Sequence, residues 1–374
     1  MALRYDEKTC RAWLASIQLP SAILERLLRD FDGQASSVYE TFFAHEGQLR
    51  DSLPAEMRTR MIRNGGIARM DAWKAQMEQE GIQALTFLDD LWPESLEPIQ
   101  EPPRLLFLRG NPDCLSREKK LAMFGARRAT YRGQQAAERL ARELSDSGVT
   151  IVSGLADGID TRAHQGCLKG KSPTIAVLGC GLDQVYPAGN WKLRNEILDK
   201  GGLLISEYCP GEKPLSWHFP VRNRIISGLC PGVVLIEARL RSGSMRTVAH
   251  AADQGREVFV YPGDPESPAF EANHQLIREG ARFFTRAEDL LEDMNWLDNP
   301  AEVSQNSGCE QEDKLPREQE AVVRALQPGA LGFDQLSAAT GLSAQELMSA
   351  LTLLQIQGRV EALPGKSYQL KTRT

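Results

Sequence analysis

Short apolar runs that alternate with helical stretches from Arg104 onward restrict the fold of this chain more than any other feature. Several runs are continuous apolar or β-branched residues without alternation, which is typical of strands buried on both faces. The runs are 105–108, 121–124, 149–152, 174–178, 203–206, 233–237, 258–261 and 281–284. Between them lie amphipathic stretches such as 134–145, whose apolar residues recur at helical spacing. The pattern predicts a doubly wound α/β domain with a parallel sheet and helices on both faces.

The segment before this sheet has a helical pattern. Residues 8–17 and 21–29 carry apolar side chains at helical spacing, and further helix is expected through Glu80. A proline-rich stretch, 91–103, then leads into the sheet. We therefore expect a helical domain over residues 1–90 and the α/β domain over 91–297.

The C-terminal part is expected to form a separate small domain. Residues 298–314 are polar and are predicted to be a linker, followed by a domain over 315–374. Three helices, 317–326, 333–339 and 344–357, precede a hairpin of 359–362 and 367–370, and Ser343 with Glu346 forms a capping box. Helices followed by a hairpin describe a winged helix. The third helix carries no Lys or Arg, which favours a protein-interaction or regulatory role over DNA reading.

Composition excludes several classes of protein. No stretch approaches the roughly 18 apolar residues that a membrane helix needs, and the first residues do not resemble a signal peptide, which predicts a soluble, cytoplasmic protein without a membrane partner. The seven cysteines form no C-x-x-C pair, which argues against a zinc site and a disulfide framework. The five histidines show no metal-ligand spacing, and no cofactor is expected.

The net charge of −6 is unevenly distributed. Residues 104–290 carry a net charge of +5, whereas 1–103 carry −6 and 291–374 carry −5. A value of +5 over this length is by itself ordinary surface charge. The position of the arginines makes it informative, because they follow strands at one edge of the predicted sheet.

Glycine-rich loops follow five of the predicted strands. Ligands of an open α/β sheet gather at the carboxyl ends of its strands, where glycine allows close approach and free N–H groups suit anionic oxygens. Arg127 and Arg128 lie in the first loop, and Arg222 and Arg224 lie at the start of a helix expected over 223–228. Arginine offers a planar fork of donors that suits phosphate. The loops therefore predict a phosphate-binding edge.

No catalytic arrangement is evident in these loops. Asp157 and Asp160 follow glycine turns and are candidates for general bases. Capping or turn roles are favoured for both, because they lie at the start of a helix.

Four blocks of sequence, in order, resemble one known family. They are Ser153–Asp160 with Ala163-His164, Thr174–Asp183 with Tyr186-Pro187, Phe219–Leu229, and Ser242-Gly243-Ser244. Together these blocks resemble the DNA-processing protein A family (DprA, also called Smf) over about residues 100–290. The first segment resembles the sterile-alpha-motif-like domain of some members, and the tail resembles their winged helix.

The resemblance implies a protein that binds DNA without catalysis, on an extended Rossmann fold. Family members bind incoming single-stranded DNA during natural transformation, protect it, load the RecA recombinase onto it for DNA recombination, and form homodimers through the Rossmann domain. Arg127 matches the arginine of the family's first glycine loop, and Ser153 and Gly154 match its second loop. Many members have a basic residue after the Tyr-Pro pair, where this chain has Ala188-Gly189, and Lys192 or Arg194 could replace it.

The candidate DNA-binding residues all come from these loops and from the helix turn after the Tyr-Pro pair. They are Gly125, Arg127, Arg128, Ser153, Gly154, Gly181, Lys192, Arg222, Asn223, Arg224, Ser242, Gly243 and Ser244.

An enzyme of nucleotide processing is the alternative. Nucleoside-monophosphate phosphoribohydrolases have similar Rossmann folds with a P-G-G-x-G-T-x-x-E signature, in which the glutamate is expected to act at the glycosidic bond. The comparable loop here, 242–250, has no glutamate. That difference favours the DNA-binding function over hydrolysis.

Overall fold

The computed structural model describes residues 5–44, 48–297, 317–327, 329–356, 360–363 and 367–370. It divides the chain into two units, 1–297 and 298–374. The expected linker 298–314 lies outside the described residues. Among the described helices, none is both long and apolar enough to cross a lipid bilayer.

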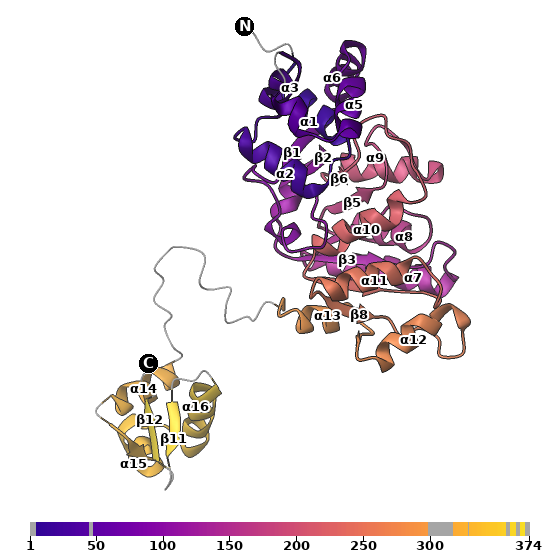
Figure 1. Ribbon diagram of the computed structural model, residues 1–374. Coiled ribbons are helices and arrows are strands. Elements are labelled where there is room, and N and C mark those ends of the chain that lie inside the picture. Colours follow the sequence, from indigo (N-terminus) through magenta and orange to yellow (C-terminus); the bar gives the residue numbers. More distant parts are fainter. Residues whose placement is uncertain are drawn as a thin grey trace. The chain divides into compact units, whose positions relative to one another are not determined.

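Six helices form the N-terminal part of the first unit (Figure 1). They are α1 Glu7–Ser16, α2 Ser21–Asp30, α3 Ala35–Ala44, α4 Gln48–Ser52, α5 Ala55–Asn64 and α6 Ile67–Glu80. Trp13 on α1 lies at their centre, fully buried, and its indole N–H donates to the carbonyl oxygen of Met61 at 3.1 Å. The helical prediction for this segment is confirmed, and its core is aromatic and methionine-rich.

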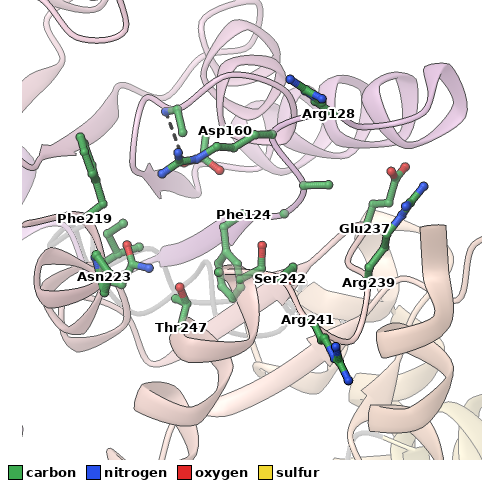
Figure 2. Close-up of a pocket in the computed structure, with 18 of the residues that line it drawn as sticks. Phe124, Arg128, Asp160, Phe219, Asn223, Glu237, Arg239, Arg241, Ser242 and Thr247 are labelled. Atoms are coloured by element: carbon green, nitrogen blue, oxygen red, sulfur yellow. Dashed lines mark hydrogen bonds between the residues drawn. The ribbon is translucent and has the colours of Figure 1, made fainter. Parts of the chain in front are cut away.

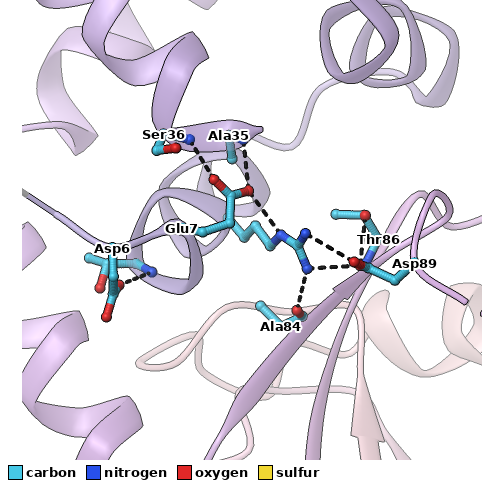
Figure 3. A network of polar contacts seen from close by, with 9 residues as sticks. Asp6, Glu7, Ala35, Ser36, Ala84, Thr86 and Asp89 are labelled. Atoms are coloured by element: carbon cyan, nitrogen blue, oxygen red, sulfur yellow. Dashed lines mark hydrogen bonds and ion pairs between the residues drawn. The ribbon is translucent and has the colours of Figure 1, made fainter. Parts of the chain in front are cut away.

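Glu7 on α1 binds the beginning of α3. Its carboxylate accepts hydrogen bonds from the backbone N–H groups of Ala35 at 2.7 Å and Ser36 at 2.9 Å (Figure 3). These N–H groups are in the first turn of α3 and have no acceptor within the helix, so a carboxylate there satisfies them and suits the positive end of the helix. The same carboxylate accepts from Arg11 at 3.0 Å.

Arg11 connects the helices to the sheet. Its guanidinium donates to the carbonyl oxygen of Ala84 and, through two nitrogens, to the carboxylate of Asp89 at 2.8 and 3.1 Å (Figure 3). Burial alone would raise the pKa of Asp89, but hydrogen bonds from Thr86 and Arg11 outweigh it and lower that pKa. The helical part is thus fixed to the edge of the sheet by charge-assisted hydrogen bonds.

Nine strands form the sheet of the first unit, in the order β1-β2-β6-β5-β4-β3-β7-β8-β9. Their bounds are β1 Gln83–Thr86, β2 Leu105–Gly110, β3 Lys120–Phe124, β4 Thr150–Ser153, β5 Thr174–Leu178, β6 Leu203–Ser206, β7 Gly232–Leu235, β8 Glu257–Val260 and β9 Arg282–Phe283. From β6 to β9 all neighbours are parallel, whereas β1 with β2 and β2 with β6 are antiparallel.

The eight predicted strands all occur, and the doubly wound α/β class is confirmed. Two features differ from the expected parallel sheet. The strand β1 was missed, because residues 83–86 directly follow a helix and give only one short apolar run. The strand β2 runs antiparallel to β6, because the connection from β2 to β3 carries no crossover helix, only the short 3-10 turn η2 Pro112–Ser116.

Helices cover both faces of this sheet (Figure 1). They are α7 Tyr131–Asp146, α8 Ile159–Cys167, α9 Trp191–Asp199, α10 His218–Gly228, α11 Ser244–Asp253, α12 Glu271–Arg278 and α13 Ala287–Asp293. Helices α7, α8 and α13 share one apolar core with the sheet, and α10, α11 and α12 share the other. The central strands β3, β4, β5, β6 and β7 therefore bury both of their faces, which explains their continuous apolar runs.

The C-terminal unit contains three helices and a small sheet. The helices are α14 Arg317–Leu326, α15 Phe333–Thr340 and α16 Ala344–Ile356, and the strands β10 Leu331–Gly332, β11 Val360–Leu363 and β12 Ser367–Leu370 pair in the order β10-β12-β11. The predicted capping box is confirmed, since Ser343 N donates to Glu346 at 2.9 Å and Glu346 N to Ser343 Oγ at 3.4 Å. Residues 357–359 and 364–366 lie outside the description.

Replacing Arg11 with alanine should lower the free energy of unfolding by about 2 kcal/mol, because Asp89 and Glu7 lose a half-buried charged partner. Urea denaturation of the purified protein measures this change. The control is Arg139→Ala, which removes an exposed pair on α7 and should cost no more than about 0.5 kcal/mol. Equal losses in the two variants would show that the Arg11 contacts do not stabilise the fold.

Candidate functional site

The order in which the chain adds strands to the sheet reverses between the parallel neighbours β3 and β7. From β3 the chain continues to β4, β5 and β6 on one side, and it then returns to place β7, β8 and β9 on the other side. Loops that leave neighbouring strands in opposite directions open a crevice at the carboxyl ends of those strands. A cavity of about 710 Å³ occupies this position.

Five segments line the cavity. They are the loop from β3 to α7, the loop from β4 into α8, the first half of α10, the segment from the end of β7 into α11, and the turn η4 Pro268–Phe270. Figure 2 shows Phe219 and Asn223 of α10 on one side, facing Arg239 and Arg241 on the other.

Arginines dominate the polar wall of this cavity. Arg127 and Arg128 come from the first loop, and Arg239 and Arg241 follow β7. All four are exposed, and within the described part of the chain no carboxylate lies within 4.0 Å of their guanidinium groups. Arg127 lies over the ring of Phe219, 5.5 Å from its centroid. The cavity thus presents uncompensated positive charge, which suits an anionic ligand.

Glu237, two residues after β7 and beside Arg239 (Figure 2), is one of two acidic residues that line the cavity, and its carboxylate already has hydrogen-bond partners. The residue is only 1% exposed. Its carboxylate accepts from the backbone N–H of Thr130 at 3.0 and 3.1 Å and from the Thr130 hydroxyl at 2.6 Å. Because Thr130 caps α7, Glu237 fixes the arginine-bearing loop to the neighbouring strand. We assign Glu237 a positioning role.

Asp160 performs a similar task in the loop after β4. Its carboxylate accepts from the backbone N–H groups of Gly154 at 3.1 Å and Ala156 at 3.4 Å. Burial raises the pKa of Asp160 to about 6, against the lowering effect of Arg222 and of the two N–H groups. The turn role expected for Asp160 therefore agrees with its contacts, while Asp157 is exposed.

Arg222 is the buried centre of this edge of the sheet. It is 4% exposed, and one guanidinium nitrogen donates to the carbonyl oxygens of Gly154, at 3.0 Å, and Val177. Burial lowers the pKa of Arg222 to about 10, while the nearby Asp160 raises it. A Cβ atom on Gly154 would lie 2.5 Å from Arg222 and 2.8 Å from Asp160, so only glycine fits between them. Arg222 thus connects α10 to the ends of β4 and β5.

Most of the predicted site residues are brought together. The cavity is lined by Gly125, Arg127, Arg128, Arg222, Asn223, Ser242, Gly243 and Ser244. Gly154 lines a smaller adjoining cavity together with Arg127 and Arg222. The Ser242 hydroxyl is buried and has no hydrogen-bond partner among the described residues, which leaves it available to a ligand.

Four predicted residues lie outside the cavity. The Ser153 hydroxyl is buried and donates to Met123 at 2.6 Å, and Gly181 packs against the backbone of Cys209. Lys192 lies over the ring of Trp191, its Nζ 5.8 Å from the centroid. Arg194, the suggested substitute for the missing basic residue, is buried and donates to a carbonyl oxygen.

Arg224 also lies outside the cavity, and the expectation that it stands at the start of a helix was wrong. The helix begins at His218 instead of 223, so Arg224 lies in its middle and away from the positive helix end. Its guanidinium binds both carboxylate oxygens of Glu207, at 2.7 and 2.8 Å, and the carbonyl oxygen of Glu101. The side chain faces the N-terminal helices, and its charge is compensated.

Sequence reasoning missed Arg239, Arg241 and Phe219 as site residues. The signal for the two arginines was present, because both directly follow a predicted strand. Phe219 had no comparable signal, since its position depends on where α10 begins. Within the described ranges no group of three or more His, Cys, Asp or Glu side chains is placed to hold a metal ion.

Arg222→Ala should lower the free energy of unfolding by about 3 kcal/mol or more, because it leaves the buried Asp160 without its partner charge. The same change at the exposed Arg127 should stay within about 0.5 kcal/mol. Chemical denaturation of both variants measures the difference. Similar values for the two would mean that Arg222 does not hold the loops together.

Comparison with known proteins agrees with this geometry. A family model described as DNA recombination-mediator protein A matches residues 83–295, and one described as DprA winged helix domain matches residues 310–366. The DNA processing protein DprA of Streptococcus pneumoniae is 44% identical over 214 residues, which cover 57% of this chain and 75% of that protein. Protein Smf of Escherichia coli is 35% identical over 299 residues, 79% of each chain.

Solved structures give the same result. The X-ray structure of DNA processing protein A from Streptococcus pneumoniae has a TM-score of 0.63 at 36% identity, covering 75% of this chain and 95% of that one. A structure of DNA processing protein A from Helicobacter pylori, described for its single-stranded DNA binding mode, has a TM-score of 0.52 at 29% identity, covering 57% and 95%. The chain therefore belongs to the DNA recombination-mediator protein A family, the family of the DprA and Smf proteins.

Proposed function

We propose that this protein binds single-stranded DNA in the arginine-lined cavity between β3 and β7. The observation that carries the proposal is the group of four exposed arginines without carboxylate partners among the described residues, Arg127, Arg128, Arg239 and Arg241. Such groups attract the phosphates of a nucleic acid. The ring of Phe219 beside Arg127 offers an apolar face to a base, and stacking of this kind is tolerant of sequence.

The proposed binding involves no chemical reaction. A hydrolase would need a carboxylate that is free to act on its substrate. Of the carboxylates that line the arginine cavity, Glu237 is buried with both oxygens bound to Thr130, and Asp160 is buried with its carboxylate bound to backbone N–H groups. These contacts favour a binding protein over the phosphoribohydrolase-like alternative.

The proposal extends to what the protein does with the bound strand. As a member of this family, the protein would protect incoming DNA during natural transformation and load RecA onto it, in the cytoplasm. The family description as a recombination mediator supports this step. We also propose that the protein forms a homodimer through the Rossmann domain. The sheet of this domain ends at the short strand β9, where Phe283 is 62% exposed and offers an apolar surface to a second copy.

Loss of single arginines should weaken binding of an oligodeoxythymidylate and reduce its dependence on salt. The slope of log affinity against log salt is negative. Its magnitude should decrease by about 0.7 in each of the variants Arg127→Ala, Arg239→Ala and Arg241→Ala, and by about 2 in the triple variant. Fluorescence anisotropy over a salt series measures the slope. The control is Arg139→Ala, whose arginine is paired with Glu143 on α7. An unchanged slope in the triple variant would refute the assignment of the cavity.

RecA should coat a single strand faster when this protein is present. The triple variant should not accelerate coating, because it cannot hold the strand that it has to deliver. The rate is followed with a labelled strand whose fluorescence changes as RecA binds. Equal rates with and without the unchanged protein would remove RecA loading from the proposal but leave DNA binding intact.

A further inference from the structure

A second cationic cleft lies at the other end of the same sheet edge. It has a volume of about 820 Å³ and is formed by α5, α6 and the loop that follows β6. The indole N–H of Trp73 on α6 donates to the carbonyl oxygen of Pro210 in that loop at 2.9 Å, which fixes the two walls together. Three arginines line the cleft: Arg60, Arg63 and Arg69.

Two of these arginines have no acidic partner. Arg60 pairs with Glu56 at 2.5 Å. Arg63 is exposed, and no carboxylate among the described residues lies within 4.0 Å of it. Arg69 binds only the neutral amide oxygen of Asn64 and lies over the ring of Trp73, 5.5 Å from its centroid.

Arg63 and Arg69 lack an acidic partner although they lie in an acidic segment of the chain. Residues 1–103 carry a net charge of −6, so acidic partners are abundant there. One further carboxylate, that of Glu212, borders the cleft but forms no ion pair within 4.0 Å with any described arginine. Two guanidinium groups thus remain uncompensated in a cleft that also offers the side-chain amides of Gln18 and Gln76, which suits an anion with several oxygens.

The cleft and the arginine cavity are ends of one row of loops. The carboxyl ends of β7, β3, β4, β5 and β6 are neighbours in this order, so roughly 19 Å separate the first from the last at about 4.8 Å a strand. The loops after β5 and β6 are joined by hydrogen bonds: Gly211 N donates to Asp183 at 2.8 Å, and Gly181 N donates to Glu212 O at 2.9 Å. Figure 1 shows α5 and α6 at the end of the sheet that holds β1, β2 and β6.

Exposed aromatic rings lie on the loops between the two ends. Tyr186, in the loop after β5, is 41% exposed, and its ring lies 5.0 Å from Phe219. Trp217, in the loop after β6, is 51% exposed. Cationic ends with aromatic faces between them are the arrangement that single-strand-binding proteins use for phosphates and bases.

We propose that the cleft of α5, α6 and the β6 loop binds the phosphodiester backbone of the same DNA strand that the arginine cavity holds. Arg63 and Arg69 are the contacting residues. The inference rests on the proposed function, because the strand must first occupy the cavity. A strand in the B-form duplex rises about 3.4 Å per nucleotide, and an extended single strand rises more, so the 19 Å between the ends corresponds to at most about six nucleotides. A strand of only about three nucleotides is too short to reach both ends.

The test compares oligodeoxythymidylates of about 3 and about 20 nucleotides, one too short and one long enough to reach both ends. For the long strand, the double variant Arg63→Ala/Arg69→Ala should bind on the order of tenfold more weakly near 0.1 M salt. The magnitude of its slope of log affinity against log salt should decrease by about 1.4. Binding of the short strand should not change. Arg63→Lys, which keeps the charge, should retain most of the long-strand affinity.

Controls separate this inference from the proposed function and from unfolding. Arg26→Ala removes an exposed arginine of α2 outside the cleft and should leave both strands unaffected. Circular dichroism and the single variant Arg63→Ala check that Arg69 is not needed for folding. Unchanged long-strand binding in a folded double variant would overturn the cleft assignment alone. Loss of short-strand binding in the Arg127 variant, measured alongside, would still support the cavity.

Discussion

The site depends first on the buried guanidinium of Arg222. Three segments that are far apart in sequence, the loop after β4, the end of strand β5 and the helix α10, meet at this one side chain. Removing its charge from water is costly, and the cost is offset only because carbonyl oxygens and the nearby Asp160 surround it. The glycine at 154 is required by the same contact, since any side chain would displace Arg222. A rigid edge of the sheet results, on which the exposed arginines are displayed.

Arginine has two different roles in this protein, and the partner decides which. Arg11, Arg222 and Arg224 are satisfied by carboxylates or carbonyl oxygens, and they hold elements together. The four exposed arginines of the cavity, Arg127, Arg128, Arg239 and Arg241, have no such partner among the described residues, so their charge is available to a ligand. The acidic side chains that line the cavity also hold elements together. Glu237 and Asp160 bind backbone N–H groups and position the loops, which leaves the cavity positive.

Much of the fold could be predicted from the sequence, because burial on both faces of a parallel strand forces continuous apolar runs. All eight predicted strands occur, and the blocks around Gly154 and Gly243 lie at the edge of the sheet where the cavities are found. The strand β1 and the direction of β2 could not be predicted. Both depend on pairing between segments distant in the chain, and a run of four residues does not specify which strand it pairs with.

The sequence by itself determined the class of fold, the family, and the fact that arginines follow the strands of one edge. Only the tertiary structure decided which arginines are free. Arg222 and Arg224 stand two residues apart in one block, yet one is buried between loops and the other pairs with Glu207. Arg239 and Arg241 received no special weight in the sequence but face the cavity. The physical reason is that burial and ion pairing are properties of neighbours in space, and a local pattern contains no information about them.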